Sequence, residues 1–410
     1  MKRYRELLAM RFVKSLIISA FPARVAYGMI GLCIFFKVER ETNSIAIAGL
    51  AIGLNGITGA LTAGIRGSML DRWGQRWPLR VFVPSYAVLI LALNAMHSQN
   101  LILITAFILG MTAPPINISV RPLWVDIVPR SSLRTAYALD TVSMNSAVVL
   151  GPILATTLSL SSRPEFALIV AAFSMALGGG ALAVHPVSNA WIPEKKDKGQ
   201  GALIKNRAIQ LLMLEGIFIG IGWGAFNIAI PAFATLEEVP WRTAWILASL
   251  GVATVIGGIL GGLVSNKVSS LISWRRIYLI WATLTIPLAF TYPGWNMAIL
   301  GAAIGLVSGA GQVFYFEVLE AVRPKGSQAS SLGWIWTVEG TFMAFGAALS
   351  GWICENYSPR YALGLTSLMT LVGLLVIFIG WQRFQPANKI PTDEEDLSAQ
   401  LDSTSDQFPH

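Results

Sequence analysis

The stretch GSMLDRWGQR, from Gly67 to Arg76, places an acid, two arginines and two glycines between two long apolar runs. Such a group is unusual in a chain of 410 residues of which 54% are hydrophobic and 13% charged. A soluble domain carries about 25% charged residues, so most of this chain is expected to lie outside water. The stretch therefore predicts a short polar turn between two membrane-spanning segments.

The apolar runs predict helices that cross a bilayer. About 20 apolar residues in a helix span the ~30 Å of hydrocarbon, and about twelve such runs occur along the chain. Runs such as FALIVAAFSMALGGGALAV, residues 166–184, are apolar on every face. A membrane barrel would instead alternate apolar and polar positions. The predicted fold is an all-α membrane protein with about twelve transmembrane helices.

The polar segments predict how the chain is divided. PEKKDKGQG, residues 193–201, separates six apolar runs from six more. The prediction is a six-helix bundle over 1–190, a cytoplasmic linker over 191–206, a second bundle over 207–385, and a disordered acidic tail over 386–410. Placing both termini in the cytoplasm puts most of the 30 Lys and Arg on that side, as the positive-inside rule requires. This bias accounts for the net charge of +8, so no nucleic-acid partner is expected.

The two predicted bundles resemble each other at a constant offset of 195 residues. Residues of the same type recur in this register. The matched pairs are Gly67 with Gly262, Asp71 with Asn266, Arg72 with Lys267, Arg80 with Arg275, Gly110 with Gly305, Asn117 with Gln312, Pro129 with Pro324, and Gly151 with Gly346. The register indicates a duplicated six-helix unit, with the copies related by an axis along the membrane normal.

The opening stretch resembles the loop between the second and third helices of the major facilitator superfamily. It has the spacing Gly, three residues, Asp-Arg, one residue, Gly, and differs at Gln75, where the family usually has Arg. The resemblance implies two six-helix halves and a conformational latch in which Asp71 meets the start of the eleventh helix, near Ser330. A loop that only anchors the topology by its charge is the alternative.

The residues predicted for this latch include glycines for close approach and arginines that pair with acids on neighbouring helices. They are Gly67, Asp71, Arg72, Gly74 and Arg76, with Arg121, Asp140 and Glu317 as structural partners of the loop.

Two further segments resemble parts of the superfamily. Gly151-Pro152 is similar to the centre of its antiporter motif, although a packing kink explains the pair equally well. APPINISVRPLW, residues 113–124, is similar to a little-characterised bacterial branch that resembles drug and metabolite efflux permeases. The resemblance implies a monomer in the bacterial cytoplasmic membrane that exports a small molecule, driven by the proton gradient without a bound cofactor.

Arg24 and Glu339 are predicted near the middle of the bilayer, where a charge costs ~2.5–3.5 kcal/mol or more, and Glu215 somewhat shallower. Glu339 is the predicted proton-titrating group, since a carboxyl partly removed from water can titrate near neutral pH. Arg24 would bind an anionic group of the substrate or tune Glu339. The alternative is a static pair of Arg24 with Glu339 or with Glu215.

Other polar and aromatic residues are candidates for the wall of a substrate cavity. The amides also fit hydrogen bonds between helices, and the tryptophans also fit the interfacial belt. The predicted cavity residues are Asn55, Asn117, Asn227, Gln312, Trp223 and Trp336.

The sequence argues against an enzyme. The histidines His97, His185 and His410 fall in a loop, at a helix end and at the terminus, and the two cysteines have no metal-binding spacing. No GxxxxGK[ST] loop for ATP is present. The predicted function is secondary transport, as a proton-driven exporter; the alternatives are a proton-coupled importer and a transport-inactive sensor or scaffold.

Overall fold

The computed structural model describes residues 2–194, 203–265 and 267–388, and its regular structure in these ranges is helical, without strands. The first half contains nine α-helices: α1 Lys2–Ala9, α2 Val13–Thr42, α3 Ile45–Trp73, α4 Arg76–Ala95, α5 Gln99–Thr112, α6 Ile116–Ile127, α7 Arg130–Ser159, α8 Glu165–Val184 and α9 Pro186–Ala190. The second half contains η1 Leu203–Lys205, α10 Arg207–Leu236, α11 Arg242–Leu263, α12 Ser270–Thr285, η2 Ile286–Phe290, α13 Trp295–Val322, α14 Gln328–Asn356, α15 Pro359–Ile379 and η3 Trp381–Asn388.

Ten helical segments in these ranges are long and apolar enough to cross a membrane. One of them joins α5 and α6, which are separated where Pro114 and Pro115 interrupt the backbone hydrogen bonds. The remaining two predicted spans coincide with α12, which is 16 residues long and continues into η2, and with α14, which is rich in Gly, Ser and Thr. The multi-pass helical fold is confirmed, and the number twelve stays a prediction.

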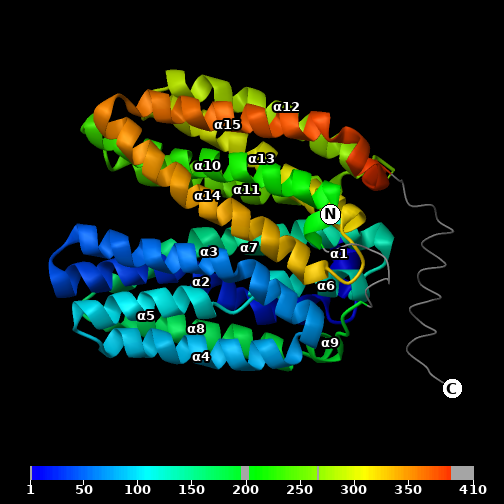
Figure 1. Ribbon diagram of the computed structural model, residues 1–410, viewed down its shortest axis with the longest axis horizontal. Coiled ribbons are helices and arrows are strands. Elements are labelled where there is room, and N and C mark those ends of the chain that lie inside the picture. The colour runs from blue at the N-terminus through cyan, green and yellow to red at the C-terminus, as the bar shows by residue number, and fades with distance from the viewer. Residues whose placement is uncertain (1, 195–202, 266, 389–410) are drawn as a thin grey trace.

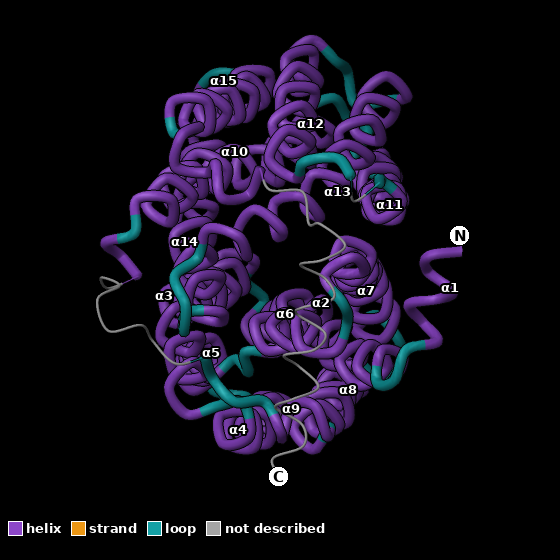
Figure 2. The backbone as a smooth tube through the Cα atoms, turned by 90° about the vertical axis from the view of Figure 1, so that its right-hand side faces the viewer, coloured by secondary structure: helices purple, strands orange, loops and turns teal. Residues whose placement is uncertain are grey.

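The helices form two bundles that lie side by side (Figure 1). Viewed from the end, α2–α9 form one bundle and α10–α15 the other (Figure 2). The bundles meet along two helix pairs, α3 with α14 and α7 with α11. Helix α1 lies at the same end of the bundle as the end of the described chain, and we refer to this end as the α1 end.

Small residues allow the helices to approach closely, as expected where lipid removes the hydrophobic drive for helix association. A Cβ atom on Gly67 would lie 2.7 Å from the carbonyl oxygen of Ala329, across the α3–α14 contact. Large apolar side chains such as Phe173, Ile299 and Leu375 point outward instead and are more than half exposed. Apolar outer surfaces of this kind suit a hydrocarbon solvent.

Several predicted segments fall outside the described residues. They include 195–202 of the predicted linker, Asn266 of the repeat register, and 389–410 of the predicted tail. Residues 386–388 of that tail belong to η3. The predicted boundaries between the halves stay predictions.

Candidate functional site

A central cavity of about 360 Å³ lies between the two bundles. Asn117, Met144 and Val148 of α6 and α7 line one side. The opposite side is formed by residues of α10, α12, α13 and α14. Its volume is within the ~300–1,000 Å³ range of pockets that take a small molecule.

Two carboxyl groups line this cavity from adjacent helices, Glu215 on α10 and Glu339 on α14. They are near enough for their charges to interact. Glu215 is buried and accepts a hydrogen bond from the Tyr278 hydroxyl at 3.1 Å, whereas Glu339 is partly accessible. In the described part of the chain, neither carboxyl forms an ion pair with a basic residue. The site therefore holds two acids whose charge no neighbouring cation neutralises.

Four of the predicted cavity residues line this space: Asn117, Gln312, Trp223 and Trp336. The amide of Asn145 on α7 donates to Gln312 Oε1 of α13 at 3.1 Å, which links the two bundles. Asn117 and Trp336 also line a second cavity of about 340 Å³ between the first bundle and α14, together with Asn55. Asn227 is exposed on α10 and lines neither of these cavities.

Arg24 pairs with Asp140, so the alternative of a static pair with Glu339 or Glu215 is wrong. The Arg24 guanidinium donates to Asp140 Oδ1 at 2.5 Å, and Arg121 Nε lies 3.2 Å from Asp140 Oδ2. These three side chains are buried and form an Arg24–Asp140–Arg121 triad within the first bundle. The triad uses all its carboxylate charge on two arginines, so Arg24 neither pairs with Glu339 or Glu215 nor lines the central cavity.

The triad also corrects the predicted surroundings of the Gly67–Arg76 stretch, of which only Gly74 and Gln75 lie between α3 and α4. Asp140 pairs with Arg24 and Arg121 and not with Arg72 or Arg76. The arginines of this stretch, Arg72 and Arg76, lie over the rings of Trp73 and Trp77 at 5.7 and 5.9 Å. No ion pair joins them to an acid among the described residues.

The Asp71 carboxylate makes the contact predicted for it. Asp71 is buried at the end of α3, and its two oxygens accept the backbone N–H groups of Ala329 and Ser330 at 2.9 and 2.7 Å. These N–H groups belong to the first turn of α14, where unpaired donors and the helix dipole favour an anion. Gly74 ends α3 with φ of 75°, a conformation that favours glycine.

Gln75, the position that differs from the superfamily pattern, is buried and joins three elements. Its Nε2 donates to the Ser119 carbonyl of α6 at 2.9 Å, and its Oε1 accepts from the Ser188 hydroxyl of α9 at 3.0 Å. A neutral amide can both donate and accept, which a guanidinium cannot.

Glu194 adds a contact that the sequence analysis missed. Its carboxylate accepts two hydrogen bonds from Arg323, at 2.8 and 3.0 Å, and one from the Gly326 N–H at 2.9 Å. Burial raises the pKa of the Glu194 carboxyl, but the Arg323 guanidinium and the Gly326 N–H together lower it below its ordinary value. Asp71 and Glu194 thus hold the α13–α14 connection from the other bundle. We call these contacts the first gate.

A second gate lies at the α1 end where α7 meets α11. Arg134, near the start of α7, donates to Glu317 of α13 at 3.0 Å and to the Val268 carbonyl at 3.0 Å. The Thr135 hydroxyl donates to the Gly262 carbonyl at 3.2 Å. Glu317 is therefore bound by Arg134, which corrects its predicted pairing with the Arg72–Arg76 loop.

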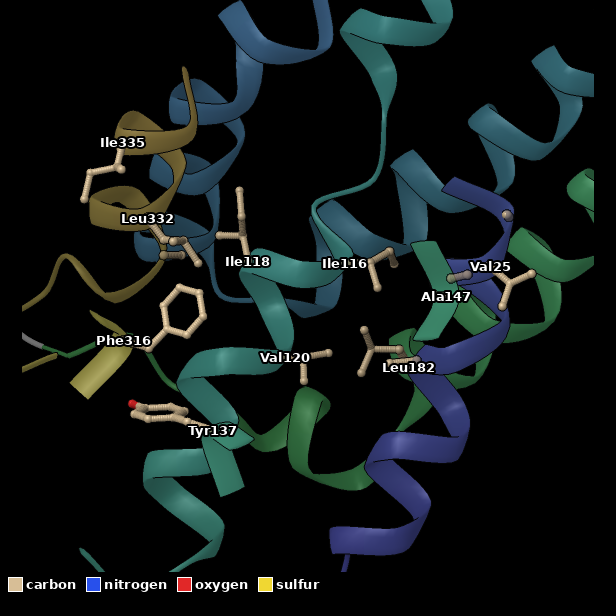
Figure 3. Close-up of a cluster of buried hydrophobic side chains, with 14 of the residues drawn as sticks. Val25, Ile116, Ile118, Val120, Tyr137, Ala147, Leu182, Phe316, Leu332 and Ile335 are labelled. Carbon is tan, nitrogen blue, oxygen red and sulfur yellow. The ribbon is translucent and has the colours of Figure 1, made fainter. Parts of the chain in front are cut away.

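Apolar side chains fill the space between the gates and the central cavity. Phe316, Leu332 and Ile335 of the second bundle lie beside Ile118 of α6 and Tyr137 of α7 (Figure 3). All five are buried. Together with the gates, they join the two bundles at the α1 end.

Gly151 lies where α7 crosses α2. A Cβ atom on Gly151 would collide with the backbone of Gly28, so the position requires a glycine for close packing. Pro152 follows within the uninterrupted helix α7. The packing interpretation of the pair has a structural basis here, while its link to antiport stays a prediction.

The sequence analysis also missed an aromatic surface in the cavity. Trp274, Tyr278 and Trp281 occur at helical spacings of four and three residues on α12 and line the cavity together. This periodicity indicates one face of a helix, so the aromatic surface could have been predicted from the sequence.

Comparisons with known proteins agree with this architecture. The sequence profile of the Major Facilitator Superfamily matches residues 16–341. The chain is 24% identical over 399 residues to the uncharacterized MFS-type transporter y4rN of Sinorhizobium fredii, covering 91% of this chain and 96% of that protein. The crystal structure of the human organic anion transporter MFSD10 (TETRAN) superposes with a TM-score of 0.71, covering 91% of this chain and 99% of that one. Its sequence identity of 13% supports the fold alone.

Proposed function

This chain belongs to the major facilitator superfamily, and from that premise we propose that it is a proton-coupled exporter of a small organic molecule. Members of this family are multi-pass membrane transporters and not enzymes. The finer proposal is an antiporter that works by alternating access as a monomer in the bacterial cytoplasmic membrane. Its α1 end would face the cytoplasm, with the proton gradient as driving force and no bound cofactor.

The observation that carries the proposal is the pair of carboxyls in the central cavity. Glu215 and Glu339 lie between the two bundles, where alternating access exposes a site to each side in turn. Intramembrane carboxyls without a cationic partner are candidates for proton relays. Arg24 and Arg121 share the Asp140 carboxylate, so this triad is better suited to hold α2, α6 and α7 together than to exchange a proton.

The gates supply the conformational part of the proposal. Asp71, Glu194 and Arg134 join the two bundles only through hydrogen bonds and ion pairs at the α1 end. Such contacts can break and re-form as the bundles rock against each other. Opening the α1 end would separate both gates and the apolar layer around Phe316.

Proteoliposomes with a trapped pH-sensitive dye test this function. With a proton gradient imposed, addition of a transported compound should move protons in the direction opposite to the compound. Glu339→Gln should abolish the proton movement, whereas Glu355→Gln, an exposed acid on the same helix, should not. Proton movement in the same direction as the compound would overturn export in favour of symport. Unchanged flux in Glu339→Gln would remove Glu339 as the coupling residue.

A further inference from the structure

Aromatic rings dominate the wall of the central cavity on the side of the second bundle. Neighbouring rings contact each other in sequence: Trp223 stacks on Trp281 with centroids 6.0 Å apart, and Trp281 meets Tyr278 at 5.1 Å. Trp274 continues the row to Tyr315 at 5.7 Å. The faces of such rings carry partial negative charge. The wall therefore offers a continuous surface that is apolar and electronegative.

The charged side chains in the described lining have one sign. Glu215 and Glu339 line the cavity, while Arg24 and Arg121 do not. Arg121 contacts the ring of Phe316 and is bound to Asp140. When either glutamate is ionised, the charged groups of the lining are negative, which favours a cation over an anion.

The same aromatic cluster already holds one cation at its edge. The Arg121 guanidinium carbon lies 3.0 Å from the centroid of the Phe316 ring and 5.7 Å from that of Trp336. Both rings line the cavity. Cations within about 6 Å of a ring centroid are attracted by the ring quadrupole, most strongly over tryptophan. Trp223 and Trp336, which also line the cavity, offer the same attraction to a ligand.

Two buried polar atoms of the lining, Asn117 Oδ1 and Trp281 Nε1, have no hydrogen-bond partner among the described residues and are left to orient a ligand. Asn117 lines the cavity from α6. An unpaired acceptor opposite two carboxyls suits a molecule with donor groups, such as the N–H of an amine.

We propose that the central cavity binds an aromatic organic cation, with its charge at Glu215 and Glu339 and its rings against the tryptophans of α10, α12 and α14. This inference rests on the proposed function because it names the substrate class of the same site. The cavity of about 360 Å³ accepts one such molecule of modest size. Release of a proton from the carboxyls leaves the negative charge that the cation neutralises, so proton and cation compete for one site.

The test compares two ions of the same shape and opposite charge, tetraphenylphosphonium and tetraphenylborate. Binding of each to the purified full-length protein is measured by isothermal titration in detergent. Tetraphenylphosphonium should bind, and tetraphenylborate should bind at least tenfold more weakly. Glu339→Gln and Glu215→Gln should each weaken tetraphenylphosphonium binding at least about tenfold, since each removes one of the two negative charges that attract the cation.

Matched variants separate the site from general effects of substitution. Glu355→Gln on α14 and Trp295→Leu, whose side chain is 77% exposed, should leave the affinity unchanged, whereas Trp223→Leu should lower it. Each variant is first required to elute as a single peak in size exclusion. Equal or tighter binding of tetraphenylborate, unchanged affinity in both glutamate variants, or binding of neither ion would overturn the substrate class.

Because binding is measured without a membrane, its failure differs from failure of the transport proposal. Tetraphenylphosphonium binding without proton movement in liposomes would sink proton-coupled export and leave the cation site standing. Proton movement triggered only by anionic compounds would support proton-coupled transport and overturn the cation site.

Discussion

Asp71→Asn provides a direct test of the first gate. Both Asp71 oxygens accept backbone N–H groups at the start of α14, at 2.9 and 2.7 Å, and the side chain is buried. The amide keeps one acceptor, loses the charge and turns its NH₂ group toward a donor. Hydrogen bonds to a charged group are worth ~1.5–3 kcal/mol, so the loss should favour separation of the α1 end by roughly 10- to 150-fold.

Distances between the bundles report this change. Spin labels at Trp77 of α4 and Arg276 of α12, both exposed and one in each bundle, can be placed after the two native cysteines are replaced by serine. Pulsed electron paramagnetic resonance should then show a larger population at long distance in Asp71→Asn. Glu165→Gln, an exposed acid at the other end of the bundle, should leave the distribution unchanged. An identical distribution in Asp71→Asn and the parent would refute the latch.

Three further changes test the packing and the ion pairs. The pKa of Glu194 is lowered in the folded protein, so its stabilising effect is present above pH 4.5 and is lost as the pH falls through the lowered value. Thermal melting should therefore show Glu194→Gln to be less stable than the parent protein near neutral pH, and the melting temperatures of the two proteins should converge in acid. A difference in melting temperature that stays constant with pH would contradict this. Gly224→Ala should lower the free energy of unfolding by about 1–3 kcal/mol, because the new Cβ meets the backbone of α14, and Gly351→Ala, which has open space, should not. Asp140→Asn should reduce the yield of folded protein more than Arg24→Gln, since it strands two buried arginines at about 3–5 kcal/mol for each broken pair; equal yields would argue against the triad.

The fold could be predicted from the sequence because the bilayer constrains it strongly. A helix in lipid must satisfy its own backbone, so long apolar runs identify spans without any knowledge of tertiary contacts. The Gly67–Arg76 stretch indicated the family, and the constant offset of 195 residues predicted the two bundles. What failed to follow was detail such as the break at Pro114 and Pro115, which divides one expected span into α5 and α6.

The site was predicted only in part, because the rotation and packing of the helices determine which charged side chains meet. Depth along a helix placed Arg24 and Glu339 at similar levels, yet they lie on different sides of the interface and Arg24 is bound to Asp140. A sequence predicts how deep a charged residue lies in the membrane. It does not predict in which direction around the helix axis its side chain points. Glu194 was missed for a related reason, since its partner Arg323 follows it by 129 residues.

The two gates show how the duplicated halves have diverged in chemistry while keeping their geometry. In the first gate a carboxylate at the end of α3, Asp71, accepts N–H groups at the start of α14. In the second gate the direction is reversed, and Arg134 at the start of α7 donates to the Ser265 and Val268 carbonyls between α11 and α12. Ala329 and Arg134 stand 195 residues apart, in the repeat register. Because the gates lie on the two helix pairs that join the bundles, rigid-body opening must break both, and their energies add. Weakening one gate therefore shifts the balance toward opening while the other, with its opposite charge pattern, continues to hold the bundles together.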